Sequence, residues 1–492
     1  MGRGGYIGGM KRFLLLFLLA LAGAGEFKDP APPKVNDSVV EVEGKAAAYE
    51  GLKFHGAPKA LAAGAVTNDW PRFLGPGHNA TSVETKLLKT LPAKMPVVWE
   101  AKKGTGYGAP AIVGDRLILF HRVGDEEIVE CLQSDTGLRF WQVKYATAYQ
   151  DRYGYCDGPR ASPVIDEGRV YTIGAEGTFS CLDLKTGHLF WRRKLLDEFK
   201  CPQNFFGVGS TPLLDGNLVI VNVGAPGGPS VVALDKKNGK MIWGAGEQWG
   251  PSYASPVPAV LHGKKRVLVF AGGESRIPSG GLMSIDPADG KLDFEYPWRS
   301  RTHESVNASS PLVIGDSVFI SECYGRGSVL VEVKADFSPK EVWSNAAFGI
   351  HFMMPIFKDG FVYGIHGHGP LDCPLVCVDV KDGKEKWRTE PEWEEVVQTR
   401  QGPRKIKLSF ARASFTQVDG RTLVLSEHGH LLWIDLNPVG YKELSRTWLF
   451  LAAETWTPPA ISRGLLYVCQ NSAEMITKQE PRIICYEMRE SK

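Results

Sequence analysis

Apolar residues recur along this chain in short runs, and the same order of runs and turns is repeated eight times. The clearest copy extends from Ala161 to Trp191. It begins with small residues before Pro163 and continues through three apolar runs, then a Thr-Gly turn at Gly187 and a closing tryptophan. Short runs with β-branched and aromatic residues, separated by Gly and Asp, are typical of antiparallel strands. Each copy therefore predicts four strands.

The residue that opens each copy sets the length of the repeat. Successive copies begin 44 to 60 residues apart. Their first residues are Pro110, Pro163, Pro212, Pro256, Pro311, Pro355, Phe415 and Pro459. Repeats of about this length, made of strands, are typical of propeller blades. The sequence predicts an all-β fold, an eight-bladed β-propeller of four-stranded blades.

The two ends of the repeat array predict how the ring closes. The eighth copy, from Pro459 to Tyr486, ends after its third strand and has no closing tryptophan. Upstream of the first copy, residues 96–100 (PVVWE) have the pattern of an isolated fourth strand. A strand from the N-terminal side should complete the last blade, because closure removes two exposed sheet edges.

The N-terminal region differs from the repeats. Residues 1–25 have the pattern of a signal peptide: Lys11 and Arg12, then a ten-residue apolar core, then small residues. This core is too short to span a bilayer, which takes about 20 residues. No cysteine follows it to carry a lipid anchor. We expect an exported protein, periplasmic or secreted, without a membrane span. Residues 26–69, rich in Ala, Pro and charge, predict a flexible linker, and residues 70–490 the propeller.

Charge and cysteine content limit the binding partners and the disulfides that we expect. The 57 basic and 55 acidic residues balance, which gives no case for binding nucleic acid or an anionic membrane. Four of the nine cysteines fall in the third strand of their copy, where other copies carry Ala or Ser, and are expected to be small buried residues. These four are Cys131, Cys181, Cys377 and Cys485. The sequence does not pair the other five, and it contains no CxxCH haem motif.

A constant spacing links the turn glycine of each copy to an outer aromatic residue four positions later. The pairs are Gly137 and Trp141, Gly187 and Trp191, Gly239 and Trp243, Gly290 and Phe294, and Gly383 and Trp387. These aromatic residues are expected to pack between neighbouring blades. The repeat resembles the Trp-docking repeat of the PQQ-like β-propellers over residues 70–486. Residues 70–76 (WPRFLGP) and 158–163 also resemble segments of exported planctomycete-type members.

This resemblance implies the fold more than the function, because the family includes PQQ-dependent alcohol dehydrogenases and an outer-membrane assembly lipoprotein. The family's alcohol dehydrogenases stack the quinone under a disulfide of two adjacent cysteines, and this chain has no Cys-Cys pair. Glu176, Asn307 and Glu322 could supply oxygen ligands for calcium. No local motif matches residue by residue, so no catalytic residue is carried over.

A ring of side chains is predicted at the mouth of the propeller, three residues before each repeat start. The series is Tyr107, Arg160, Gly209, Tyr253, Ala308, Phe352, Arg412 and Trp456. Its four aromatic residues and two arginines would suit a planar anionic ligand, stacked on rings and clamped by guanidinium groups. If so, Arg160→Ala should weaken binding with little loss of stability. The alternative is ordinary loop packing with solvated arginines.

Two further features lie in connecting loops. His366 and His368 place two imidazoles on one side of an extended strand, either as a metal pair or as polar groups bonded to turn backbone. Residues 391–407 lengthen one connection with separate acidic and basic runs, which predicts a docking loop or a solvated insertion.

The sequence favours a non-catalytic binding or scaffold protein of the cell envelope. We expect a monomer that binds an envelope protein, a glycan or a small anionic ligand, with no cofactor required. One alternative is a PQQ- and calcium-dependent dehydrogenase acting on an alcohol or sugar. The other is a scaffold for outer-membrane protein assembly.

Overall fold

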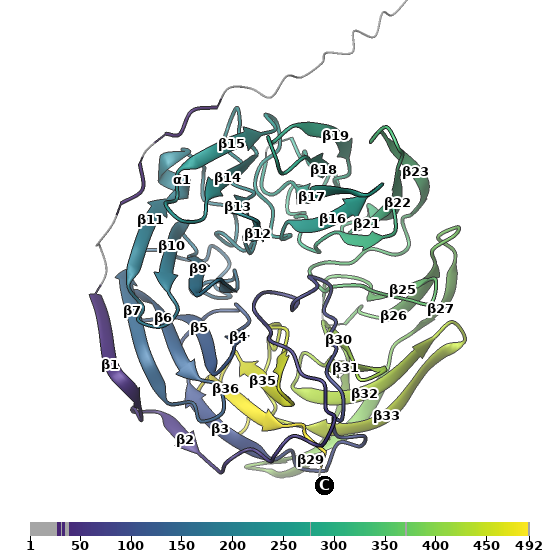
Figure 1. Cartoon of the computed structure of the whole chain (residues 1–492). Helices are drawn as coiled ribbons and strands as arrows, with labels where there is room; N and C mark the ends of the chain where they lie inside the picture. The colour runs from purple at the N-terminus through teal and green to yellow at the C-terminus, as the bar shows by residue number, and fades with distance from the viewer. Residues whose placement is uncertain (1–26, 31, 35–38, 276, 370, 491–492) are drawn as a thin grey trace, which may run out of the picture.

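The computed structural model describes residues 27–30, 32–34, 39–275, 277–369 and 371–490. Eight antiparallel sheets stand around a central axis like the blades of a propeller (Figure 1). Within the described residues the only helix is α1 (Leu195–Glu198), a single turn. The prediction of an all-β, eight-bladed propeller is confirmed. Among the described residues, no helix is long and apolar enough to cross a membrane.

Each blade runs outward from the axis in chain order. The first four blades are β4 (Ala111–Val113), β5 (Arg116–Val123), β6 (Glu126–Gln133) and β7 (Arg139–Ala146); β8 (Val164–Asp166), β9 (Arg169–Ile173), β10 (Thr178–Asp183) and β11 (Leu189–Lys194); β12 (Leu213–Asp215), β13 (Leu218–Val221), β14 (Val231–Asp235) and β15 (Met241–Ala245); β16 (Val257–Leu261), β17 (Lys264–Ala271), β18 (Gly281–Ile285) and β19 (Leu292–Pro297).

The remaining blades follow the same order, and the last one is completed from the N-terminal side. They are β20 (Leu312–Ile314), β21 (Ser317–Glu322), β22 (Gly327–Val333) and β23 (Pro339–Asn345); β24 (Ile356–Lys358), β25 (Phe361–Ile365), β26 (Leu375–Asp379) and β27 (Glu385–Thr389); β30 (Ser414–Val418), β31 (Arg421–Leu425), β32 (His430–Asn437) and β33 (Gly440–Trp448); β34 (Ala460–Ser462), β35 (Leu465–Gln470), β36 (Arg482–Glu487) and β3 (Val97–Lys102). A separate hairpin, β28 (Glu392–Thr399) and β29 (Gly402–Ser409), stands between the sixth and seventh blades.

The third and fourth strands of a blade meet at a small residue opposite the tryptophan. In the second blade Cys181 pairs with Trp191, and the register shifts at the next residue, which marks a β-bulge. Four of the other blades pair tryptophan with cysteine or alanine in this way. The four third-strand cysteines are buried, as predicted, and all nine cysteines of the chain are free. A small side chain leaves room for the indole in these blades, whereas the fifth blade places Leu330 opposite Trp343.

The outer tryptophans join neighbouring blades. The Trp141 indole N–H donates to the Leu184 carbonyl of the next blade at 3.0 Å, and a Cβ on Gly187 would lie 2.8 Å from that indole. Gly187 has a φ of +72°, which glycine adopts without strain. Trp191 repeats this contact with the Lys236 carbonyl at 3.2 Å. The predicted packing of tryptophan between blades is confirmed, and the spacing from glycine to tryptophan reflects docking on the turn.

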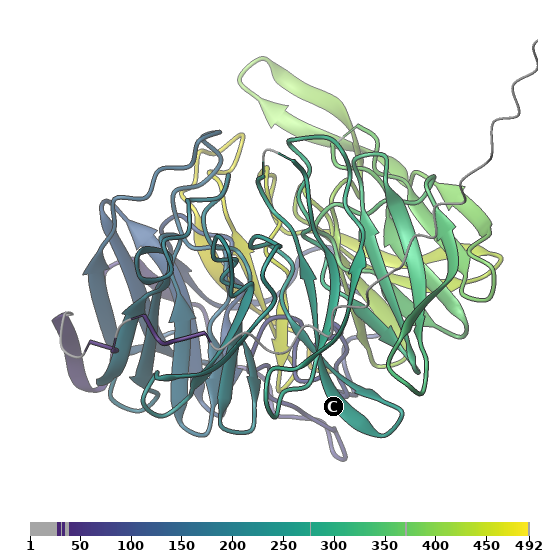
Figure 2. The same cartoon turned by 90° about the horizontal axis from the view of Figure 1, so that it is seen from above.

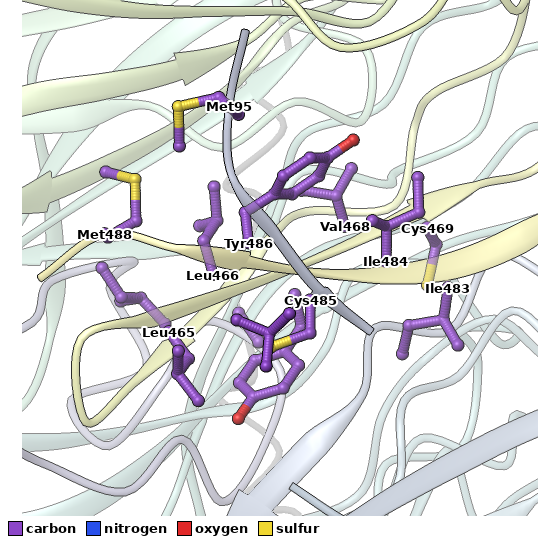
Figure 3. Packing of buried hydrophobic residues seen from close by; sticks show 14 of the residues in the cluster. Met95, Leu465, Leu466, Val468, Cys469, Ile483, Ile484, Cys485, Tyr486 and Met488 are labelled. Atoms are coloured by element: carbon purple, nitrogen blue, oxygen red, sulfur yellow. The ribbon is translucent and has the colours of Figure 1, made fainter. Parts of the chain in front are cut away.

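Ring closure uses the same contact. Strand β3 pairs with β36, so that Trp99 lies opposite Cys485 in the eighth blade. The Trp99 indole is fully buried and donates to the Ser134 carbonyl of the first blade at 2.9 Å. Figure 3 shows the apolar core of this blade, in which Tyr486 and Met488 lie near Met95 from the N-terminal side. The predicted closure by an N-terminal strand is confirmed.

The region predicted as a linker contributes two further strands. Strand β1 (Val39–Ala47) pairs with β7, and β2 (Leu52–Phe54) pairs with β3, so each adds a fifth strand to a blade. Lys34 also pairs with Arg192 at the outer edge of the second blade. Backbone pairing at an open sheet edge does not depend on an apolar pattern, so composition alone does not reveal these strands. The predicted signal peptide, residues 1–25, lies outside the described residues.

Residues 70–81 cross the central opening of the ring (Figure 1). Trp70 bridges to Ile112 in β4, and Thr81 bridges to Gln417 in β30 on another blade. Between these points Leu74 packs with Met354 of the sixth blade. Three non-glycine residues of this segment, at positions 74, 78 and 80, have φ between 55° and 61°, a conformation that L residues rarely adopt. We call this segment the axial plug.

Candidate functional site

The structure brings the six predicted mouth residues to one end of the axis. All six lie on the loops that lead into the innermost strands, and all are half-buried. Trp456 contacts the rings of Tyr107 and Phe352, with centroids 5.2 Å and 5.5 Å away. The Arg412 guanidinium lies 4.4 Å from the centre of the same indole. Trp456 therefore occupies the middle of the predicted ring.

Arg160 and Tyr253 meet through a residue that the sequence analysis did not select. The Phe206 ring lies 5.3 Å from the Arg160 guanidinium and 5.6 Å from the Tyr253 ring. The Phe206 backbone N–H donates to the Tyr253 hydroxyl at 2.8 Å. Burial raises the pKa of Tyr253, so this hydroxyl stays protonated at neutral pH.

Both arginines of the ring are already paired with buried carboxylates. Arg160 forms an ion pair with Asp151, whose side chain is fully buried. It also donates to the carbonyls of Cys156 at 3.1 Å and Phe206 at 3.0 Å. The alternative of solvated arginines is therefore wrong for Arg160. Because the guanidinium links three residues of two loops, the structure leads us to expect that Arg160→Ala costs stability, unlike the expectation from the sequence.

Arg412 holds Glu427 by two hydrogen bonds. Its Nε donates at 2.9 Å and its Nη2 at 2.5 Å to the two carboxylate oxygens. Burial alone would raise the pKa of Glu427, but the Arg412 bonds lower it below its usual value. A bidentate pair of this kind uses the fork of the guanidinium. The mouth is therefore close to charge-neutral at both arginines.

Two tyrosines on the connection between β7 and β8 extend the aromatic surface outward. Tyr153 and Tyr155 are 55% and 50% exposed. Tyr155 lies 5.9 Å from Trp456 and 6.1 Å from Phe206, and Tyr153 lies 5.6 Å from Phe206. Comparison of equivalent repeat positions missed them because they lie within the connection, away from the position three residues before the repeat start. The RYGYC run, with two tyrosines in an exposed loop, was the available signal.

We call the six predicted residues together with Tyr153, Tyr155 and Phe206 the aromatic mouth. Both guanidinium groups and the hydroxyls of Tyr107 and Tyr253 already bond within the protein, whereas the Trp456 indole N–H is buried without a hydrogen-bond partner among the described residues. The Tyr107 hydroxyl donates to Glu454 at 2.7 Å, and at the rim Arg152 pairs with Glu274 at 2.9 Å. The resulting surface offers aromatic rings with little free charge.

The histidine pair lies in polar loop contacts on the same face. His366 Nδ1 accepts the Gly349 backbone N–H at 3.0 Å, as the non-metal alternative expects. His368 instead contacts the rings of Tyr324 and His351, with centroids 5.0 Å and 5.7 Å away. Burial, with His368 and Arg412 nearby, lowers the pKa of His351 to about 3. In the part of the chain that the structure describes, no group of three His, Cys, Asp or Glu side chains is placed to hold a metal ion.

The three residues considered as calcium ligands have different surroundings. Glu176 accepts hydrogen bonds from Thr147 and from the Ala148 backbone N–H. Glu322 Oε2 and Asn307 Oδ1 are buried without a hydrogen-bond partner among the described residues. Burial raises the pKa of Glu322. Two oxygens of this kind are a partial donor set, short of the six to eight that calcium takes.

The β28–β29 hairpin projects from one face of the ring (Figure 2). Its base is anchored by Trp393, whose ring lies 4.9 Å from that of His430. Its strands are mostly exposed and carry cross-strand ion pairs such as Glu394 with Lys405 at 2.9 Å. The insertion predicted at residues 391–407 is thus an ordered hairpin.

Comparison with known proteins places the chain among PQQ-repeat propellers. The PQQ_2 family model, described as outer membrane protein assembly factor BamB, matches residues 125–389. The outer membrane protein assembly factor BamB of Burkholderia pseudomallei (strain K96243) is 28% identical over 173 residues, 35% of this chain. The match spans 39% of the length of that relative.

Solved structures of similar fold include two dehydrogenases. A europium-containing methanol dehydrogenase superposes with a TM-score of 0.61 at 12% identity, over 85% of this chain and 98% of that one. A quinohemoprotein alcohol dehydrogenase from Comamonas testosteroni gives a TM-score of 0.57 at 12% identity, over 86% and 81%. At this identity the likeness shows the fold alone.

Proposed function

This chain belongs to the PQQ_2 family, described as outer membrane protein assembly factor BamB, and from that premise we propose that it is a non-catalytic binding protein of the cell envelope. The aromatic mouth holds an extended segment of another polypeptide. The observation that carries this proposal is the set of contacting rings around Trp456, continued outward by exposed Tyr153 and Tyr155.

Aromatic side chains suit this role because they bury large areas at a low cost in conformational entropy. Tyr, Trp and Phe are enriched at the centre of protein interfaces. Grooves lined by aromatic residues bind extended peptide segments, whose backbone is already open for contact. The exposed tyrosines give an incoming segment its first apolar contact, and the half-buried rings beneath them give it a floor.

The charges of the mouth favour a polypeptide over a small anion. Arg160 and Arg412 already donate hydrogen bonds to Asp151 and Glu427. An anionic ligand would therefore have to displace a buried carboxylate from each arginine. Such a displacement leaves an unpaired buried charge, which is strongly unfavourable. A neutral, partly apolar segment meets no such cost.

The β28–β29 hairpin supports the same proposal. Its connection joins a fourth strand to a first strand, as the loops of the mouth do, and its edges are open for backbone pairing. Val396 is 56% exposed on this hairpin. An extended segment leaving the mouth would find a strand edge there, the geometry of β-augmentation.

Replacing the two exposed tyrosines tests the proposal. The double variant Tyr153→Ala, Tyr155→Ala should bind a dye-labelled, urea-denatured outer-membrane β-barrel protein about tenfold more weakly or worse, because interface aromatics dominate binding energy. Fluorescence anisotropy after dilution from urea measures the affinity. Unfolding of the variant should remain at the wild-type denaturant midpoint.

Val439→Ala provides the matched control. Val439 is 91% exposed on the turn between β32 and β33, away from the mouth loops. Its loss should leave the affinity unchanged. Equal affinity of the wild type and the double tyrosine variant would remove the mouth from consideration as the binding surface.

The residues of the mouth do not fit a quinone cofactor. The two arginines are already bonded to carboxylates, Trp456 lies between the surrounding rings, and the chain lacks the adjacent cysteine pair of the family's alcohol dehydrogenases. We therefore derive no reaction through PQQ.

A titration tests this disagreement directly. Calorimetric titration of the protein with PQQ and Ca²⁺ should give no saturable heat, and a dye-linked screen of alcohols and sugars should give no turnover. Saturable binding accompanied by turnover would contradict the proposed function and favour a dehydrogenase, with Glu322 and Asn307 as the first cation ligands to replace.

A further inference from the structure

A ring of hydroxyl groups lies further along the axis than the aromatic mouth. Each hydroxyl accepts a backbone N–H from the preceding blade, at 2.9 to 3.0 Å. The four are Ser162, Thr211, Ser255 and Ser310. Within the described chain none of these hydroxyls donates a hydrogen bond. Each O–H therefore remains available as a donor.

Arg72 of the axial plug approaches the same ring. Its Nη1 donates to His78 Nε2 at 3.0 Å, while its Nε is buried without a hydrogen-bond partner. No carboxylate of the described residues forms an ion pair with it. Burial lowers the pKa of Arg72 but a guanidinium remains charged. The carboxylate that acts on Arg72 from nearby is Asp166, which raises its pKa less than burial lowers it and is itself paired with Lys236 at 2.9 Å.

His78 adds no positive charge to this site. Burial and the adjacent Arg72 lower its pKa to about 3. Since Nε2 accepts from Arg72, the single proton of the neutral ring is on Nδ1. The Arg72 guanidinium and the His78 Nδ1–H are consequently both donors at this site.

These groups line one small cavity on the axis. Its polar lining comes from Arg72 and His78 of the axial plug and from Thr211, Ser255 and Ser310 of the blades. The rest of the lining is apolar: Phe73, Leu74, Pro212, Pro256 and Val257. The cavity volume is ≈ 10 Å³, room for about one water-sized body. A cation and several O–H donors converging on so small a space are suited to a compact anion.

We propose that the axial cavity binds a single halide-sized anion, chloride under ordinary conditions, between Arg72 and the hydroxyl ring. The anion neutralises Arg72 and accepts the free O–H groups of three blades. It thereby ties the axial plug to the inner strands. This site is separate from the aromatic mouth and does not depend on the proposed function.

Bromide is the probe, because its anomalous scattering distinguishes it from water. Crystals of the full chain grown with bromide should show an anomalous peak within hydrogen-bonding distance of Arg72 Nε. In solution, replacing sulfate by chloride at constant ionic strength should raise the unfolding midpoint of the wild type relative to that of Arg72→Met. This comparison cancels the general stabilising effect of sulfate, which is too large for the cavity.

Arg72→Met should abolish the peak and weaken the halide dependence about tenfold or more. Arg116→Met is the control: this arginine stacks on Phe140 at 3.9 Å, away from the plug, and its loss should leave both results intact. No anomalous peak in the wild type, or a peak that persists in Arg72→Met, would overturn the proposal. The wild-type crystal decides the matter even if the variant does not fold.

Discussion

Trp191→Ala should lower the free energy of unfolding by about 3–5 kcal/mol, the usual cost of deleting a core aromatic. The Trp191 side chain is 1% exposed and packs against Tyr171 and Phe179, with ring centroids 6.2 Å and 5.3 Å away. Its indole also donates to Lys236 of the next blade. The substitution therefore opens a cavity inside one blade and removes a contact between two. Urea unfolding followed by circular dichroism measures the loss.

Gly239→Ala tests the other side of the same contact. A Cβ at Gly239 would lie 2.7 Å from the Trp191 ring, and its φ of +70° disfavours alanine. If the Trp191 ring docks on Gly239, the double variant Trp191→Ala, Gly239→Ala should lose less stability than the sum of the two single variants. Tyr153→Ala, at an exposed ring, should change stability by no more than about 0.5 kcal/mol. Full additivity would show that tryptophan and glycine act independently.

The fold was predictable because one physical contact recurs at a fixed spacing. A turn glycine and a tryptophan four residues later repeat in most copies. In the closed ring, Trp99 of the eighth blade makes the same contact with the first blade. Strands β1 and β2 were not predictable in this way. Their attachment is backbone pairing to edges that the sequence does not label.

The positions of the mouth residues were predictable, but their partners were not. Counting back from each repeat start places Arg160 and Trp456 at the same end of the axis. It does not reveal that Asp151 folds back to Arg160, because the course of the chain within the loop between β7 and β8 does not follow from the repeat. Phe206 was missed for the same reason, since it lies in the connection after α1. The irregular loops therefore supply the groups that neutralise and cover Arg160, and the repeat pattern does not predict them.

The axial plug shows a similar limit. Residues 70–76 were noticed only through a resemblance, without a place in the fold. Their left-handed residues and their contacts with three or more blades depend on the complete ring. The residues of the hydroxyl ring are small residues just before four of the repeat starts, but their hydrogen bonds run between blades and do not follow from the repeat pattern.

Arg160→Ala should destabilise the protein by about 3–5 kcal/mol, the cost of removing one partner of a buried ion pair. The Asp151 carboxylate is fully buried and would lose its counter-charge, while the carbonyls of Cys156 and Phe206 would each lose a donor. Asp151→Asn should cost a similar amount, because it leaves the Arg160 guanidinium without a counter-charge. Thermal and urea unfolding of both variants measure these losses.

The double variant Arg160→Met, Asp151→Asn distinguishes the contribution of the ion pair from that of the other Arg160 contacts. Removing both charges relieves the unpaired charge that each single change leaves, so the combined loss should be clearly smaller than the sum. If the losses simply add, the ion pair does not hold the loop, and Arg160 acts through its carbonyl contacts alone. If they do not add, the ion pair is what shapes the loop that carries Tyr153 and Tyr155. The arginine predicted to clamp a ligand then contributes to binding by holding the aromatic surface in place.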